Sequence, residues 1–197
     1  MPFYFRLTRR GKNEMVDFFT KLFRAYELGR LNIYDGDEAI KFTRVPRVLK
    51  EEQWDLRAFP VVLVGNARGE PQPMSIDKDF MDYDEGGSPV HGSWIEVRIP
   101  VGCVSQTKDE SNDIADFLLF NLLRPDAKNY FFPKNIDLPS PPSIDGETLI
   151  KADTTEFELY RTDFTVPINF HWSESMAELG TLIDILAEPT FVADLGK

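Results

Sequence analysis

The sequence predicts an α+β fold in which a mixed, mainly antiparallel sheet has a long amphipathic helix packed across it. Three observations lead to this prediction: β-rich or alternating runs at residues 59–64 and 94–101, a capped helix at 107–124, and renewed alternation at 157–172. The chain has 197 residues, of which 42% are hydrophobic and 28% are charged, as in ordinary globular proteins. We therefore expect residues 1–197 to form a single domain.

Two strands and a buried thiol are expected in the first half of the sheet. The segment from Phe59 to Val64 is rich in β-branched residues and is followed by Gly65-Asn66, which indicates a buried strand and then a turn. Trp94 to Val101 alternates apolar and charged residues, which indicates a half-buried strand. The only cysteine, Cys103, continues this apolar pattern, so we expect it in the core and expect no intrachain disulfide.

Two amphipathic helices are expected, and the second of them should pack across the sheet. Between Asn13 and Gly29 apolar residues recur at helical spacing, with Asn13 placed to cap the start and Gly29 the end. A stronger signal begins at Thr107, which is predicted to form a capping box with Glu110. Pro125 ends this second helix, and its apolar stripe consists of Ile114, Phe117, Leu118 and Leu122.

The last third of the chain predicts a proline-rich arm and a hairpin. Residues 133–143 contain four prolines, so we expect an extended arm that cannot join the interior of a sheet. Alternation over 157–172, interrupted by a predicted turn at Arg161-Thr162-Asp163, indicates a β-hairpin. Pro167 lacks an N–H donor, which favours an edge strand or a bulge. Residues 173–197 are expected to form a short helix and then a strand.

The charge balance restricts the classes of partner. The formal net charge is −11, and the 22 basic residues are scattered along the chain. Binding to nucleic acid by phosphate neutralisation needs a concentrated cationic surface, so we do not expect it. The sequence also shows no signal peptide and no membrane segment, because its longest apolar run, Val61 to Val64, is far too short to span a bilayer.

An acidic stretch at residues 77–92 is the most prominent candidate site. Five carboxylates that could bind calcium lie close together there: Asp77, Asp79, Asp82, Asp84 and Glu85. Their spacing lacks the glycine and glutamate positions of an EF-hand, so a solvated acidic loop is the preferred interpretation. Because Phe80 and Tyr83 would be costly to leave exposed, a third interpretation places this long loop against another subunit.

Recognisable catalytic motifs are missing from the sequence. The histidines, His91 and His171, match no zinc-binding spacing, and there is no nucleophile elbow or phosphate-binding glycine loop. A metal-dependent nuclease using Asp145, Glu147 and Lys151 is the alternative enzyme class. On a strand, however, Glu147 and Lys151 would lie about 13 Å apart, too far to act on one phosphate. We therefore expect no enzyme activity and no cofactor.

Several segments together resemble the tail-terminator and neck proteins of tailed bacteriophages. They are Phe59-Pro-Val-Val-Leu-Val-Gly-Asn66, Pro73-Met-Ser-Ile-Asp77, Ile95-Glu-Val-Arg-Ile-Pro-Val-Gly-Cys-Val-Ser105, Ile114-Ala-Asp-Phe-Leu-Leu119 and Asp163-Phe-Thr-Val-Pro-Ile-Asn-Phe170. The resemblance covers residues 59–172, in the order strand, long loop, strand and acidic-capped helix. The long segment before Phe59 and the arm at 133–143 depart from the smaller terminators.

This resemblance implies a non-catalytic structural protein of the virion neck or tail, assembled in the host cytoplasm. Such subunits close into a ring, here expected to be a hexamer, that caps the tail tube and joins it to head-completion proteins. The implied partners are other copies of the chain, the tail tube protein and a head-completion or connector protein. DNA would pass through the ring without specific binding. Another head–tail connector or tail-completion subunit is the alternative within this class.

Contacts between subunits are expected in the two long segments that lack a regular pattern, the acidic loop and the proline-rich arm. Both segments carry apolar groups that a free monomer could not cheaply expose. The predicted interaction residues are Asp77, Asp79, Phe80, Asp82, Tyr83, Asp84, Ile136 and Leu138.

Overall fold

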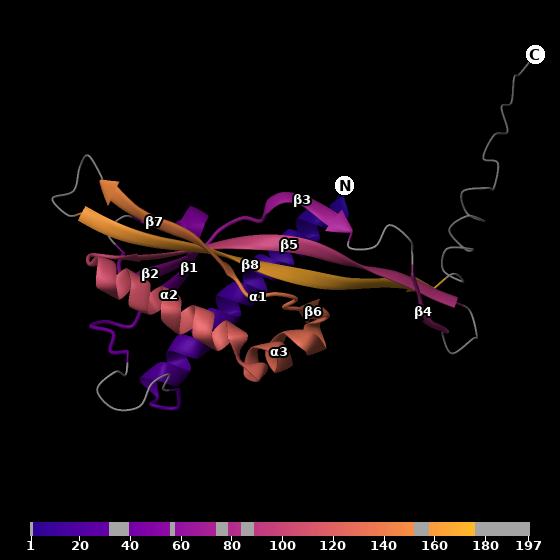
Figure 1. The fold of residues 1–197 in the computed structure, drawn as a ribbon, viewed down its shortest axis with the longest axis horizontal. Coiled ribbons are helices and arrows are strands. Elements are labelled where there is room, and N and C mark those ends of the chain that lie inside the picture. The colour runs from indigo at the N-terminus through magenta and orange to yellow at the C-terminus, as the bar shows by residue number, and fades with distance from the viewer. Residues whose placement is uncertain are drawn as a thin grey trace, which may run out of the picture. The chain divides into compact units, whose positions relative to one another are not determined.

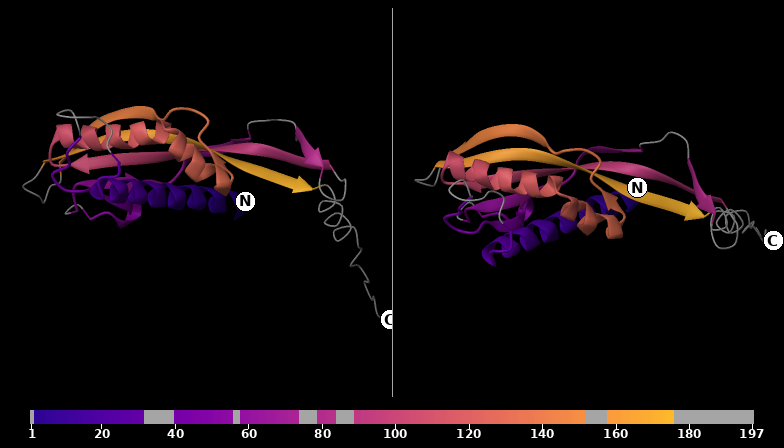
Figure 2. Two further views of the ribbon diagram at one scale, coloured as in Figure 1. Left: turned by 90° about the horizontal axis from the view of Figure 1, so that it is seen from below. Right: turned by 60° about the horizontal axis from the view of Figure 1, so that its bottom comes forward.

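A computed structural model describes residues 2–31, 40–55, 58–73, 79–83, 89–151 and 158–175. Figure 1 shows the elements of these residues, and Figure 2 gives two further views. The helices are α1 (Pro2–Glu27), α2 (Lys108–Leu123) and α3 (Pro125–Phe131), with the 3₁₀ helices η2 (Glu51–Gln53) and η3 (Phe132–Lys134). The strands are β1 (Arg47–Lys50), β2 (Val61–Val64), β3 (Arg68–Pro73), β4 (Asp79–Tyr83), β5 (Pro89–Ser105), β6 (Ile136–Asp137), β7 (Ser143–Lys151) and β8 (Glu158–Ser175).

The strands of the described residues form one mixed, curled sheet. Its main path runs β1-β2-β5-β8-β6, while β3 and β4 pair with β5 and β7 pairs with β8. Strands β1 and β2 are parallel, whereas β2 with β5, β4 with β5, and β6 and β7 with β8 are antiparallel. The predicted α+β class with a mixed sheet is therefore confirmed.

The contacts of the chain group into two units. The first contains the described residues within 1–72 and 96–170, and the second those within 73–95 and 171–175. Strands β5 and β8 each contribute residues to both units, whereas all three α-helices belong to the first. The core described below is that of the first unit, and a single domain over residues 1–197 stays a prediction.

Helix α1 begins earlier than the sequence pattern indicated. The expected start at Asn13 is wrong, because α1 begins at Pro2 and Asn13 lies inside it. Packing explains the difference, since Gly11 lets this part of α1 approach the sheet closely. A Cβ atom at Gly11 would lie only 2.5 Å from Cδ1 of Ile168 in β8. A glycine that lowers local helix propensity is thus the residue that allows the helix to dock.

The predicted end of α1 at Gly29 is confirmed. Gly29 has a φ of 65°, in the left-handed region that glycine adopts without strain. Its N–H donates to the Tyr26 carbonyl at 2.9 Å, and the Arg30 N–H donates to the Ala25 carbonyl at 3.0 Å. These two bonds form a Schellman motif, which satisfies carbonyl groups that the helix itself leaves unpaired.

Helix α2 has the start and end that the sequence predicted. The Thr107 hydroxyl accepts a hydrogen bond from the Glu110 N–H at 3.3 Å, which confirms Thr107 as the cap. The other half of the capping box is wrong, because the Glu110 carboxylate instead accepts a hydrogen bond from the Ser105 hydroxyl. Pro125 follows the end of α2 and opens α3, a helix that the sequence pattern did not predict.

The apolar stripe of α2 lies in the core as expected. All of its members are buried: Ile114, Phe117, Leu118 and Leu122. The Phe117 ring stacks on Phe23 of α1 with the ring centroids 5.2 Å apart. On the same helix the Ser111 hydroxyl lies 3.0 Å from that of Thr162 in β8. Helix α2 therefore contacts both α1 and β8, and in Figure 1 α3 continues beyond it.

Strand β8 runs without interruption, so the predicted hairpin turn at Arg161-Thr162-Asp163 is wrong. The hairpin is instead formed by β7 and β8, which pair from Ser143 opposite Thr165 to Lys151 opposite Glu158. One face of β8 is buried at every second residue: Thr162, Phe164, Val166, Ile168 and Phe170. Pro167 lies between the pairings with β7 and β6, where the sheet tolerates a residue that lacks an N–H.

The centre of the sheet is buried on both faces. Every residue of β2 is buried, which confirms the predicted buried strand, and Cys103 of β5 is buried as expected. Burial raises the pKa of the Cys103 thiol. Val61, Leu63, Val104 and Leu159 form an apolar cluster between β2, β5 and β8. None of the described helices combines the length and the apolar character needed to cross a membrane.

We predict that Phe117→Ala and Leu118→Ala each destabilise the protein by about 2–5 kcal/mol, because each removes a fully buried side chain. Leu123→Ala is the matched control on the same helix, since Leu123 is 59% exposed, and its effect should stay below about 0.5 kcal/mol. Urea denaturation followed by circular dichroism measures all three. Core variants that unfold at the same urea concentration as the parent would show that the buried stripe has been wrongly assigned.

Candidate functional site

The acidic stretch is a β-hairpin in its described residues. Strand β4 pairs with the beginning of β5, with a register shift between Phe80 and Asp82 that marks a bulge. The expected loop over 77–92 is therefore wrong for this part, because main-chain pairing with β5 gives it regular structure. Of the predicted interaction residues, Asp79, Phe80, Asp82 and Tyr83 lie in β4, and Asp77 and Asp84 lie outside the described residues.

The proline-rich arm packs two of its side chains, Ile136 and Leu138, into its own chain. Its residues form η3 and then β6, which pairs with β8 at the end of the sheet path. Ile136 is 2% exposed and Leu138 is 8% exposed. The prediction that these two side chains contact a neighbour is corrected, because each is already covered within the subunit. The four prolines predicted a segment that cannot join the sheet, but only Ile136 and Asp137 pair with β8, and neither of them is a proline.

Two residues of the alternative nuclease site, Asp145 and Glu147, make structural contacts. The Thr165 hydroxyl donates to Asp145 at 2.6 Å, which links β7 to β8. Glu147 pairs with Lys108 at 2.6 Å and accepts a hydrogen bond from Asn112 at 3.0 Å, which links β7 to α2. These two partners, Lys108 foremost, lower the pKa of Glu147. Across the described part of the chain, no group of three or more potential metal ligands occurs.

A largely buried arginine connects the sheet to η2. The Arg161 side chain is 17% exposed, and its guanidinium donates to Asp163 at 2.7 Å and to Glu51 at 3.0 Å. Gly102 of β5 provides the space, because a Cβ atom there would lie 2.7 Å from Arg161 Nε. Burial opposes the charge of Arg161, but the hydrogen bonds to Asp163 and Glu51 outweigh burial and raise its pKa.

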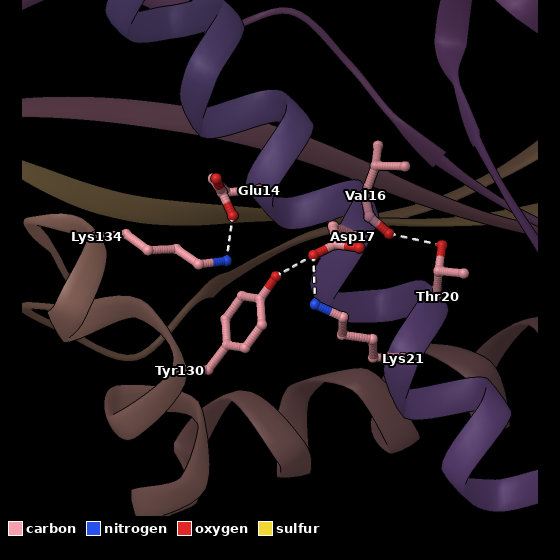
Figure 3. Close-up of polar contacts among 7 residues, drawn as sticks. All are labelled: Glu14, Val16, Asp17, Thr20, Lys21, Tyr130 and Lys134. Atoms are coloured by element: carbon pink, nitrogen blue, oxygen red, sulfur yellow. Dashed lines mark hydrogen bonds and ion pairs between the residues drawn. The ribbon is translucent and has the colours of Figure 1, made fainter.

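A second polar cluster joins α1 to α3 and η3 (Figure 3). Lys134 pairs with Glu14 of α1, and its Nζ lies 3.5 Å from the centroid of the Tyr130 ring. The Tyr130 hydroxyl donates to Asp17, which also pairs with Lys21 at 2.7 Å. The sequence pattern did not reveal this cluster, because Asp17 and Tyr130 are 113 residues apart in the chain.

The contacts of Asp17 and Tyr130 change the pKa of both groups. Hydrogen bonds from Lys21 and Tyr130 lower the pKa of Asp17, whereas burial and the bond to Asp17 raise the pKa of Tyr130. Because the pKa of Asp17 is lower in the folded protein, its contribution to stability is present above the ordinary aspartate pKa. That contribution is lost as the pH falls through the pKa of the folded state.

A pocket of about 430 Å³ is lined by residues from α1, from the β1–η2 segment and from the chain after β2. Three of the lining residues are the cations Arg9, Lys12 and Lys50, against a single carboxylate, Glu52. The Lys12 side chain is 6% exposed, and its ammonium donates to Glu52 and, at 3.0 Å, to Asn66 Oδ1. We refer to this site as the cationic pocket. The sequence did not predict the cationic pocket, because its lining residues come from segments that are far apart along the chain.

Large apolar side chains are exposed on two parts of the first unit. On β7, Ile144 is 70% exposed and Leu149 is 41% exposed. On the helical side, Leu123 is 59% exposed and Phe132 is 73% exposed. A second pocket, of about 190 Å³, lies beside Leu123, and its other apolar lining residues are Leu122, Leu138, Pro139, Pro141, Pro142 and Val166.

We predict that Tyr130→Phe lowers stability by about 1 kcal/mol at neutral pH, because it removes the hydroxyl that donates to Asp17 but keeps the ring beneath Lys134. The difference from the parent should shrink as the pH falls through the pKa of folded Asp17, since a protonated carboxyl no longer prefers this donor. Asp17→Asn is the control, in which Tyr130→Phe should show no such pH dependence. Thermal unfolding between pH 2 and pH 7 measures the effect, and a pH-independent difference would contradict the assignment.

Comparison with known protein families finds no family model that matches this chain, and comparison with curated proteins finds no match.

Proposed function

We propose that this chain is a structural subunit that assembles with copies of itself, and in particular a tail-terminator or neck protein of a tailed bacteriophage. The observation that carries the proposal is the exposed apolar surface of strand β7, at an edge of the sheet. Among the described strands, β7 pairs with β8 alone, so the other side of its main chain has no strand partner.

Exposed apolar side chains on an edge strand favour association. Natural proteins usually protect such edges with charges, prolines or a covering segment, because an open edge can pair with another chain. Strand β7 carries the charged residues Asp145, Glu147 and Lys151, but it also presents Ile144 and Leu149, which are 70% and 41% exposed. A second copy that adds a strand here would satisfy main-chain groups and remove both side chains from water.

The apolar surface continues from β7 into the arm that precedes it. The 190 Å³ pocket is lined by Pro139, Pro141 and Pro142, and β7 begins at Ser143, directly after these prolines. Leu123, which lines the same pocket, is 59% exposed. The segment from Pro139 into β7 therefore contributes both an open strand edge and part of the lining of an apolar pocket, which suits a contact with a folded neighbour better than a contact with a small molecule.

The more specific part of the proposal is supported by the resemblance of residues 59–172 to tail terminators. In that assignment α2 is the long helix packed across the sheet, and the subunits close into a ring, expected to be a hexamer. The ring would join the tail tube protein to a head-completion or connector protein within the virion. The net charge of −11 suits a conduit that DNA passes without being held, because an acidic lining repels phosphate.

We predict that the double variant Ile144→Lys, Leu149→Lys associates at least about tenfold more weakly than the parent, because a charge at a sheet edge opposes strand addition. The variant should stay folded, since both side chains are exposed. Leu28→Lys is the control, because Leu28 is 58% exposed just beyond the end of α1. Sedimentation velocity gives the association state, and negative-stain electron microscopy shows whether the parent forms rings. A parent that stays monomeric at high concentration would rule out the proposed function.

A further inference from the structure

The cationic pocket is a concentration of positive charge on a strongly acidic chain. Three cations and one carboxylate line it, while the whole chain has 33 acidic and 22 basic residues. The ion pair with Glu52 compensates Lys12, but neither Arg9 nor Lys50 forms an ion pair with any described residue. Among the described residues that line it, the pocket therefore carries an excess of positive charge.

The hydrogen-bonding groups of the pocket point to an anionic ligand. An ammonium group has three donor protons, and Lys12 uses two of them for Glu52 and Asn66. The guanidinium of Arg9 adds further donors, and the amide of Asn13 also lines the pocket. Such a set of donors, beside two cations that form no ion pair with a described residue, suits carboxylate oxygens.

The size of the pocket favours several carboxylates on one polypeptide over a single small anion. The pocket volume of about 430 Å³ lies within the range of sites that enclose whole small-molecule ligands. This volume is much larger than a single carboxylate group needs. The chain itself contains a matching segment, because residues 77–85 include five carboxylates and one lysine. Strand β4 gives the middle of that segment an extended hairpin form, suitable for insertion between side chains.

We propose that the cationic pocket of one copy binds the acidic β4 hairpin of the next copy. The inference rests on the proposed self-assembly and names the contact that orients neighbouring subunits. The pocket belongs to the first unit of the chain and the hairpin to the second, so the two surfaces differ. A contact between different surfaces is head-to-tail, and repetition of such a contact generates a ring when the rotation between neighbouring copies closes.

Charge reversal tests the two halves of this contact separately. The pocket variant is Arg9→Glu, Lys50→Glu, which leaves the buried Lys12 and its partners in place. The hairpin variant is Asp79→Lys, Asp82→Lys. Each variant alone should associate at least about tenfold more weakly than the parent, because like charges then face each other. A chain that carries both pairs of changes should recover association, since its lysines then face its glutamates.

Mixing the two variants tests the head-to-tail geometry. In an equimolar mixture, the unchanged hairpin of the pocket variant meets the unchanged pocket of the hairpin variant, and the introduced lysines of the hairpin variant meet the introduced glutamates of the pocket variant. The mixture should therefore recover ring assembly with the two variants alternating, although each variant alone associates weakly. Control variants reverse exposed charges elsewhere: Arg30→Glu with Lys41→Glu, and Glu27→Lys with Asp126→Lys. Both controls should assemble like the parent. Sedimentation velocity distinguishes monomer, dimer and ring.

Two results would contradict the inference and leave the proposed function standing. One is normal ring formation by the pocket variant or the hairpin variant while the parent also forms rings. The other is failure of the double-reversal chain to recover, together with a mixture that stays monomeric. A monomeric parent would instead remove both the inference and the proposed function, so the two failures are distinguishable.

Discussion

The sheet depends on β8 remaining unbroken through Arg161, Thr162 and Asp163. Strand β8 pairs with β5 on the main path of the sheet and also with β6 and β7. It therefore connects β6, which belongs to the proline-rich arm, and β7 to the centre of the sheet. Three polar residues in succession would ordinarily favour a turn. Here Arg161 binds Asp163 and Glu51, and Thr162 lies 3.0 Å from Ser111. An unpaired charge with so little exposure would cost several kcal/mol, so these partners are required for the strand.

Two glycines make the surrounding packing possible. Gly102 leaves room for the Arg161 guanidinium, and Gly11 leaves room for Ile168, with hypothetical Cβ atoms at 2.7 Å and 2.5 Å from these side chains. The first brings β5 against the charged group of β8, and the second brings α1 against the apolar face of the same strand. The absence of a side chain at these two positions therefore lets the neighbouring strand β5 and the helix α1 both approach β8 closely.

Local signals predicted the features that depend on a few neighbouring residues. The cap at Thr107 and the end of α1 at Gly29 follow from side-chain and main-chain geometry within one helical turn. The uninterrupted β8 could not be predicted in this way, because Glu51, a partner of Arg161, lies 110 residues away. The structure of the arm was not predicted for the same reason, since the strand that contains the buried Ile136 pairs with β8, which lies far along the chain. The cationic pocket likewise collects residues from three separate segments.

Assembly of an acidic subunit needs local attraction that acts at short range. Two copies with a net charge of −11 repel each other, although salt limits this repulsion to about 8 Å at physiological ionic strength. Within that distance the apolar side chains of β7 favour contact but select a partner orientation only weakly, because the hydrophobic effect is non-directional. A pocket with an excess of cations adds direction, since it attracts one acidic segment and leaves the remaining like-charged surfaces apart. In the proposed assembly, the overall negative charge thus opposes wrong contacts, and the cationic pocket determines the correct one.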